Sequence, residues 1–450
     1  MNRKQNRLTC IIGMLLIGVA IAPIRLAGQN QEGQNNAQPR RYAVTALGTF
    51  GGNVSSAAGI NNKGWVVGDS SFPRDTHEHA ALWLHGVMTD LGTLGGPNSS
   101  IGFIGAHPND SGLIVGNAQT STLDPLGEYW GANFGCNASG TNQSCEGWQY
   151  LFRGFSWQNG VMSALPKLGG NNTAALGRTN RQGEIAGTSE VDNPDPSCLA
   201  PQILDWVPVV WKPNGKTRKL ALFPGDSVGA ASGINDQGDA VGGTGFCATP
   251  GTASLTHALL WKKDSVTDLG SLGGEFNNFA VSINNRGQVI GLSDLQGDAT
   301  SHAFLWQNGV MTDLGTLPGD FFSIPYQIND SGQVVGQSCD ANFNCRAFFW
   351  ENGTMTDLNS LVSGDTSLYL IAAWNINDSG VIVGLSYVEN GEYAPAFVAV
   401  PCDQERVEEP IEDNAQQVTG NGKSKIVLPE NIREMLRRRE AWAAFGRVTK

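Results

Sequence analysis

Carboxylates and aromatic rings gather in two long insertions, residues 119–151 and 190–206, which interrupt an otherwise regular sequence pattern. Rings can stack on a sugar or pack against a protein, and carboxylates add polar contacts. We therefore predict a binding site for a protein or a glycan, formed by Tyr129, Trp130, Trp148, Tyr150, Asp192, Asp195 and Trp206. The alternative is that these rings bury one another in a small core held by cysteines.

A carbohydrate-active enzyme, a glycosidase or lyase, is the alternative function, with its acid and base drawn from Asp192, Asp195, Asp205 or Glu146. Such an enzyme needs two carboxyl groups about 5–10 Å apart. The sequence has no complete Gly-x-x-x-x-Gly-Lys-Ser/Thr phosphate loop and no His-Glu-x-x-His helix. We therefore expect a binding protein rather than an enzyme, and no cofactor.

Histidine spacing gives no convincing metal site. His77 and His79 could face the same side of one strand, but a zinc ion needs further ligands, and the sequence places none at a defined spacing. A histidine before an alanine recurs in three repeats, at His79, His257 and His302, which favours a structural hydrogen bond over chemistry. We expect no metal.

A short motif, Asn-x-x-Gly-x-x-x-Gly, recurs seven times along the chain. Asn is favoured at the start of a tight turn, and the first Gly supplies the positive φ that closes it. The second Gly falls inside the following strand and indicates close packing or a bulge. We predict structural turns rather than ligand sites at these pairs: Asn61 and Gly64, Asn109 and Gly112, Asn180 and Gly183, Asn235 and Gly238, Asn284 and Gly287, Asn329 and Gly332, and Asn377 and Gly380.

Each repeat predicts four short strands. In the clearest one, 277–315, apolar strands flank first the Asn-x-x-Gly turn and then an Asn-Gly pair, which is a strong hairpin signal. Four-stranded units of about 40–50 residues are typical of propeller blades. We predict an all-β, seven-bladed β-propeller over 42–402, closed by pairing a first strand (42–47) with a last strand (396–400). An open β-solenoid is the alternative.

Strand order assigns the connections to two faces of the propeller. In an antiparallel blade, the turns after the first and third strands emerge on one face, and the loops after the second strand emerge on the other. The Asn-x-x-Gly and Asn-Gly turns belong to the first face, and the insertions 119–151 and 190–206 to the second. Because binding residues gather on long loops of a rigid scaffold, we expect function on the second face.

The repeated phrase resembles a known family. Residues 302–317, His-Ala-Phe-Leu-Trp-Gln-Asn-Gly-Val-Met-Thr-Asp-Leu-Gly-Thr-Leu, and 328–336, Ile-Asn-Asp-Ser-Gly-Gln-Val-Val-Gly, are similar to the bacterial extracellular repeat family called HAF. The resemblance covers about 42–400 and is strongest across units five and six. Unit two departs from it, since Arg153-Gly154-Phe155 stands where the family has His-Ala-Phe. The resemblance implies an exported repeat protein and provides no catalytic residues.

The segments outside the repeats are interpreted from their composition. Residues 1–28 have a basic start, an apolar run and small residues at the end, which indicate a bacterial signal peptide and a secreted, periplasmic or cell-surface protein. A retained N-terminal anchor is the alternative. Residues 29–41 form a polar spacer, 403–424 an acidic linker, and 425–450 a basic tail with a helix over 429–442. The tail could rest on the propeller, fray in solvent, or bind a membrane surface or a partner.

The body of the chain is acidic. Residues 29–422 carry 17 Lys and Arg against 38 Asp and Glu, whereas 423–450 carry 8 against 3. Nucleic-acid binding needs a basic surface, so we exclude nucleic acid as a partner. After the signal, no run is long and apolar enough to span a membrane, and we expect a monomer.

Cysteine positions agree with export, since disulfides persist in oxidising compartments. Two close pairs lie within single loops, and a third pair occupies equivalent loops of adjacent repeats; the candidate bridges are Cys136 with Cys145, Cys339 with Cys345, and Cys198 with Cys247. Cys402 is then left over. Spacing alone does not fix the connectivity.

Overall fold

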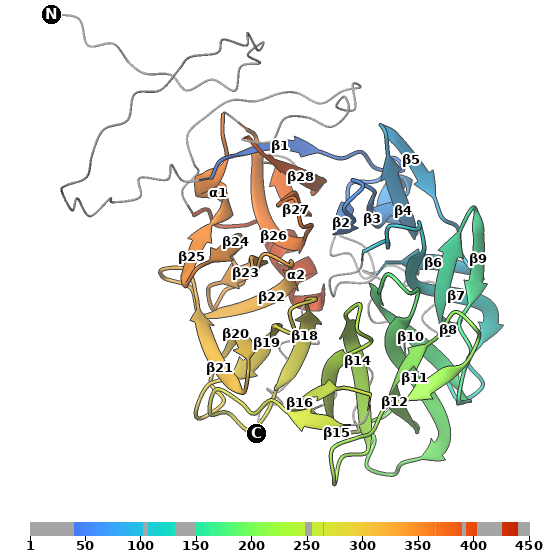
Figure 1. The fold of residues 1–450 in the computed structure, drawn as a ribbon. Coiled ribbons are helices and arrows are strands. Elements are labelled where there is room, and N and C mark those ends of the chain that lie inside the picture. Colours follow the sequence, from blue (N-terminus) through green and yellow to red (C-terminus); the bar gives the residue numbers. More distant parts are fainter. Residues whose placement is uncertain are drawn as a thin grey trace, which may run out of the picture.

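The computed structural model of the protein describes residues 40–101, 107–128, 130, 150–247, 254–263, 265–364, 366–388, 393–402 and 425–439. Seven four-stranded antiparallel sheets surround a central axis, which confirms the predicted seven-bladed propeller and excludes the open solenoid (Figure 1). The predicted signal peptide, almost all of the polar spacer and the acidic linker lie outside the described residues.

Blades 1 to 6 each consist of four strands that are consecutive in sequence. The strands of blades 1 to 3 are β2 (Ser55–Ile60), β3 (Val66–Ser71), β4 (Glu78–Leu84), β5 (Val87–Asp90), β6 (Gly95–Ser100), β7 (Ile114–Leu123), β8 (Tyr150–Gln158), β9 (Val161–Ala164), β10 (Gly169–Thr179), β11 (Ile185–Pro194), β12 (Leu204–Trp211) and β13 (Thr217–Lys219). Those of blades 4 to 6 are β14 (Val228–Ile234), β15 (Ala240–Phe246), β16 (Ser254–Trp261), β17 (Val266–Asp268), β18 (Phe279–Ile283), β19 (Val289–Asp294), β20 (Ser301–Gln307), β21 (Val310–Gly315), β22 (Phe322–Ile328), β23 (Val334–Cys339), β24 (Cys345–Glu351) and β25 (Thr354–Asp357).

Blade 7 closes the ring with both ends of the repeat array. It contains β26 (Leu368–Ile376), β27 (Ile382–Val388), β28 (Ala396–Pro401) and the N-terminal strand β1 (Tyr42–Ala46). β1 pairs antiparallel with β28, from Tyr42 opposite Pro401 to Ala46 opposite Phe397. The predicted pairing of first and last strands is therefore confirmed. The helical elements are η1 (Pro73–Asp75), α1 (Leu358–Leu361) and α2 (Glu430–Arg439).

The second glycine of each motif lets two strands approach closely inside a blade. A Cβ added at Gly68 would lie 1.8 Å from the carbonyl oxygen of Ser56, and one added at Gly336 would lie 2.1 Å from that of Ile324. The partner strand is irregular just beyond these contacts, with register shifts after Ala57 and after Pro325. Close packing beside a bulge therefore explains the glycine, as the sequence predicts.

The asparagine of each motif closes its own turn. In blade 5 the Asn284 Oδ1 accepts backbone N–H groups from Arg286 and Gln288, each at 3.0 Å. Gly287 then takes a φ of +75°, which costs a glycine little because it has no Cβ. The seven motif asparagines are all buried, between 4% and 7% exposed, so their amides are held away from water.

The remaining amide N–H of each asparagine links one blade to the next. Each Nδ2 donates to the backbone carbonyl of the corresponding asparagine in the following blade, at 3.0–3.3 Å, and the seventh bond returns to the first blade. We call this closed cycle the asparagine ring; it consists of Asn61, Asn109, Asn180, Asn235, Asn284, Asn329 and Asn377. The sequence predicts the turns but not the ring, because the ring requires all seven turns at one height on the axis.

The recurring histidine and aspartate of the repeat pair with each other or with a neighbouring carboxylate. The observed contacts are His79 Nδ1 with Asp90 at 2.9 Å, His302 Nδ1 with Asp313 at 3.0 Å, and His257 Nδ1 with Asp226 at 2.9 Å. The structural role predicted for these histidines is therefore confirmed. In blade 2 Arg153 replaces the histidine, and its Nη2 donates to the Leu165 carbonyl at 2.6 Å.

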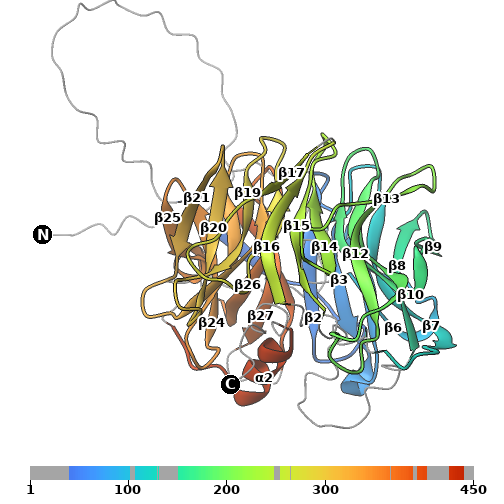
Figure 2. The same cartoon turned by 90° about the horizontal axis from the view of Figure 1, so that it is seen from below.

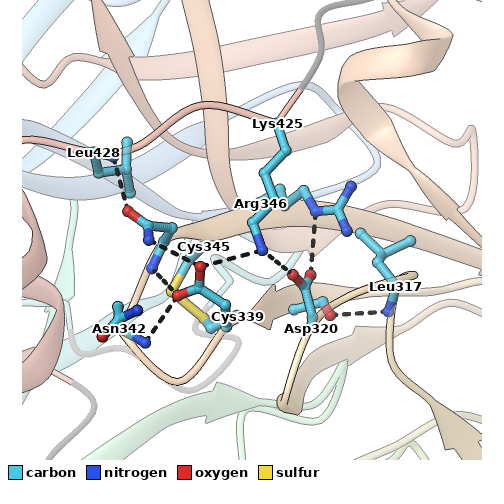
Figure 3. Close-up of a disulfide and its surroundings, with 11 residues drawn as sticks. Leu317, Asp320, Cys339, Asn342, Cys345, Arg346, Lys425 and Leu428 are labelled. Atoms are coloured by element: carbon cyan, nitrogen blue, oxygen red, sulfur yellow. Dashed lines mark hydrogen bonds and ion pairs between the residues drawn. A yellow bond between two sulfur atoms is a disulfide. The ribbon is translucent and has the colours of Figure 1, made fainter.

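The C-terminal helix α2 rests on the propeller, at the face that carries the second-to-third-strand loops (Figure 2). Ile432, Met435 and Leu436 are buried in the same apolar cluster as inner-strand residues such as Ile324 and Trp374. Opposite charges hold the entry to the helix, and Figure 3 shows Lys425 beside Asp320, with Nζ 2.6 Å from the carboxylate. Of the predicted placements of the tail, the structure therefore has the one in which its helix rests on the propeller. In the described part of the chain no helix is long and apolar enough to cross a bilayer.

We expect substitution in the asparagine ring to weaken the whole propeller. Asn284→Ala removes three hydrogen bonds within its turn and one inter-blade bond. It leaves buried groups unpaired, so the free energy of unfolding should fall by about 2–4 kcal/mol. Asn284→Asp keeps the Oδ1 acceptor but puts a buried carboxylate oxygen against the Asn329 carbonyl and Gln288 Oε1, and should give at least as large a loss. Urea unfolding measures both. Asn308→Gly, at an exposed turn with positive φ, is the control and should change little. Equal effects of Asn284→Ala and Asn308→Gly would contradict a role for the ring.

Candidate functional site

The loop after β11 is fastened to both neighbouring blades. Within the loop, the Asp195 N–H donates to the Ile203 carbonyl at 2.9 Å. Cys198 forms a disulfide with Cys247, which follows β15 in blade 4, with 4.5 Å between the Cα atoms. The predicted bridge between adjacent repeats is therefore confirmed. These contacts fix the position of the loop.

The tryptophans of the two insertions form a small core. The rings of Trp130 and Trp206 meet edge to face with centroids 6.1 Å apart, and both side chains are buried with Phe152. This corrects the prediction that these two rings bind a ligand. Burying the rings beneath the loop removes their apolar surface from water, which stabilises the fold more than leaving them exposed for a ligand. Tyr150 is half-buried at the start of β8. The other candidates of the first insertion lie outside the described residues: Tyr129, Cys136, Cys145, Glu146 and Trp148.

A pair of buried glutamates joins the blade 2 insertion to blade 3. Glu128 Oε1 accepts the N–H groups of Ile203 and Leu204 at 2.8 and 2.7 Å. Glu190 lies beside it and accepts the Asn172 N–H at 2.8 Å. Burial, and then the charge of Glu190, raises the pKa of Glu128 to about 8, so this carboxyl is largely protonated at neutral pH. Nothing in the residue spacing indicates this pair, because Glu128 sits in an insertion without a repeat pattern.

Two of the predicted carboxylates come together beside the disulfide. One oxygen each from Asp195 and Asp205 and the sulfurs of Cys198 and Cys247 all lie within 4.8 Å of one another. Burial raises the pKa of Asp205 to about 6, whereas hydrogen bonds from Ser197 lower the pKa of Asp195. The environments of the two carboxyl groups thus differ in the sense required for an acid and a base. Asp192, the third predicted carboxylate, is exposed in β11 outside this group.

Large apolar side chains are exposed on the same rim. We call them the insertion patch: Leu123 (53% exposed), Leu126 (41%), Leu199 (54%), Ile203 (39%) and Phe246 (53%). Hydrogen bonds from 203–204 to Glu128 bring the blade 2 and blade 3 members together, and the disulfide brings the blade 3 and blade 4 members together. The sequence predicts the insertions but not this patch, because exposure depends on which side of each loop packs inward.

The opposite face carries a polar pocket of about 130 Å³ on the axis, lined by the asparagine ring and its neighbours. The buried Arg178 guanidinium lies there. It reaches from blade 3 to the Ser282 hydroxyl of blade 5 and the Tyr326 carbonyl of blade 6, the latter at 2.8 Å. Burial lowers its pKa. This side chain ties three blades together, which fits the structural role predicted for the turn face.

Comparison with known proteins finds similar solved structures but no family. No family model matches the sequence, and no curated protein matches it. Solved structures similar to it include the propeller domain of the Trilobed protease from Pyrococcus furiosus (10% identity, TM-score 0.40, covering 67% of this chain and 79% of that one). Puromycin hydrolase (12%, 0.44, 81% and 55%) and a gluconolactonase from Xanthomonas campestris (10%, 0.29, 64% and 90%) are also similar. We transfer no site residue from these proteins.

Because of Glu128, we expect the free energy of unfolding to fall as the pH rises. Because its pKa is raised from 4.5 to about 8, the native state binds more protons than the unfolded chain between these values, so this group destabilises the fold progressively as it ionises. Glu128→Gln mimics the neutral form. We expect its advantage over the natural chain to grow from near zero below pH 4.5 to roughly 3–5 kcal/mol at pH 8 and above. Urea unfolding across this range tests it.

Glu275→Gln provides the control for this series, since Glu275 is exposed. Its difference from the natural chain should stay flat with pH. A Glu128→Gln difference that is equally flat would show that Glu128 ionises normally in the folded protein.

Proposed function

We propose that the chain is a non-enzymatic binding propeller whose insertion patch docks a protein partner with apolar and basic side chains. The observation that carries this proposal is the gathering of five exposed large apolar residues on one rim, above loops fastened by a disulfide and a buried core. Apolar side chains exposed together at the surface of a soluble protein are typical of interaction sites.

The negative charge of this protein indicates which side chains a partner would present. The chain carries a formal charge of −12, and Asp192 and Asp195 stand beside the patch. An acidic rim around apolar residues favours a partner with Lys or Arg around an apolar or aromatic centre. Rigid loops lose little conformational entropy on binding, which supports useful affinity from a modest contact area.

We infer that the protein acts outside the cytoplasm. The expected signal peptide supports this, and so do the disulfides Cys198–Cys247 and Cys339–Cys345, because disulfides persist in oxidising compartments. Membership of the HAF repeat family is part of the same proposal and is supported by the His-Ala-Phe phrase at 302–304.

Random-peptide phage display on the immobilised full chain tests the docking surface. Enriched peptides should combine Lys or Arg with aromatic or aliphatic residues, and should bind a Leu199→Asp/Phe246→Asp variant at least tenfold more weakly. Val310→Asp changes an equally exposed valine on blade 5 and should bind them normally. Peptides whose binding is the same on all three proteins would overturn the assignment of the patch. Mass analysis should confirm that the disulfide next to Leu199 is intact.

A carbohydrate-active enzyme is the second candidate function. It is favoured by the Asp195 and Asp205 oxygens within 4.8 Å of each other, with Asp205 as the acid and Asp195 as the nucleophile or base. Carboxyl groups about 5–5.5 Å apart are typical of glycosidases that retain configuration.

Hydrolysis of a panel of aryl glycosides and polysaccharides separates the two candidates. If the enzyme reading holds, the natural chain releases product and Asp205→Asn reduces kcat by at least a hundredfold, since the acid is lost. Asp192→Asn, outside the pair, should retain activity. Absence of turnover by the natural chain across the panel would remove this candidate and leave the binding proposal untouched.

A further inference from the structure

The junction of blades 3 and 4 holds four side chains of a kind that bind zinc. Asp195, Cys198, Asp205 and Cys247 each offer one ligand atom, and these atoms lie within 4.8 Å of one another. The two sulfurs are joined as a disulfide in the structure. We propose that reduction of this disulfide creates a tetrahedral Zn²⁺ site of two thiolates and two carboxylates, and that the ion then replaces the disulfide as the link between the blades.

Asp205 is already arranged as a ligand. Its side chain is 7% exposed, and within the described residues its Oδ1 accepts no hydrogen bond. Its other oxygen, Oδ2, accepts from Asn193 Nδ2 at 2.6 Å, which fixes the orientation of the carboxylate. The carboxyl groups of Asp205 and Asp195 are also in side-chain contact with each other, and a cation bound between them would stabilise the charged form of both.

Asp195 is oriented in a similar way from the other side. Its Oδ1 accepts the Ser197 N–H at 2.8 Å and the Ser197 hydroxyl at 2.7 Å. These bonds stabilise the charged carboxylate, which is the form that binds a cation. Both carboxylates therefore have an outer-shell hydrogen bond, as ligands of metal sites usually do.

The backbone needs little movement to change from disulfide to metal site. The Cα atoms of Cys198 and Cys247 are 4.5 Å apart. Zn–S bonds of about 2.3 Å with tetrahedral angles place two thiolates roughly 3.8 Å apart. The sulfurs must therefore separate by about 2 Å, which rotation about the two Cα–Cβ bonds can provide.

The second disulfide lacks this ligand set and serves as an internal comparison. Around Cys339–Cys345, basic side chains form ion pairs with the nearby carboxylates. Arg346 Nε lies 3.1 Å from Asp320, and Lys425 also contacts Asp320 (Figure 3). Lys425 contacts Asp340 as well. These carboxylates are already neutralised by ion pairs. Reduction there should give two thiols without a metal site.

The change from disulfide to zinc site requires a reductant, and we propose a dithiol. Two electrons and two protons from the dithiol convert the disulfide to two thiols, and the dithiol becomes a disulfide. Zn²⁺ then binds as the two thiol protons leave to solvent, since the thiolate is the ligand.

Cobalt titration of the full chain tests the site. After anaerobic reduction with a phosphine, one Co²⁺ per chain should give thiolate-to-metal charge-transfer absorption that Zn²⁺ abolishes. Cys198→Ser/Cys247→Ser should lose this signal, whereas Cys339→Ser/Cys345→Ser should keep it. Asp205→Asn retains both cysteines and the disulfide, so its folding can be checked in the oxidised form; its Co²⁺ affinity should fall at least tenfold.

Three results would overturn the proposal: the same signal in the Cys198→Ser/Cys247→Ser variant, unchanged affinity in Asp205→Asn, or equal binding by the oxidised natural chain. The readout requires only metal and reductant. Its outcome is therefore independent of whether the insertion patch binds a protein.

Discussion

The asparagine ring is the constraint on which the rest of the propeller depends. Each motif asparagine accepts from a backbone amide of its own turn with Oδ1 and donates to a carbonyl of the next blade with Nδ2, as Asn284 does, so turn formation and blade assembly share one buried side chain. The bonds run in one direction around the axis and return to their start. Seven blades are therefore held at one height, and the other face of each blade is free to vary in loop length.

The difference between the regular turn face and the variable loop face explains how much of the structure the sequence could predict. Turns, strands and the closing pair β1–β28 follow from local residue preferences and a period that repeats, so they were predictable from Asn284, Gly287 and their counterparts. The candidate site was predictable only in part. Asp195 and Asp205 were placed in the correct loop, but the burial of Trp130 and Trp206 depends on packing between two insertions, which have no period.

The loop face combines fixed and exposed groups in a small area. The core around Trp206, the protonated Glu128 and the Cys198–Cys247 bridge hold three blades in register. Above them stand apolar side chains and carboxylates. Because packing and a disulfide hold the loops from beneath, the exposed residues are not needed to keep the loops in place, which is the usual condition for a surface to acquire a binding role.

The pairing of β1 with β28 also has a consequence for biosynthesis. β1 is synthesised first but cannot pair until β28, the last strand, has been synthesised. Helix α2, which packs Ile432 and Leu436 into the central cluster, is synthesised later still. Contacts so distant in sequence slow the final step of folding. The ring therefore cannot be completed until β28 has been synthesised.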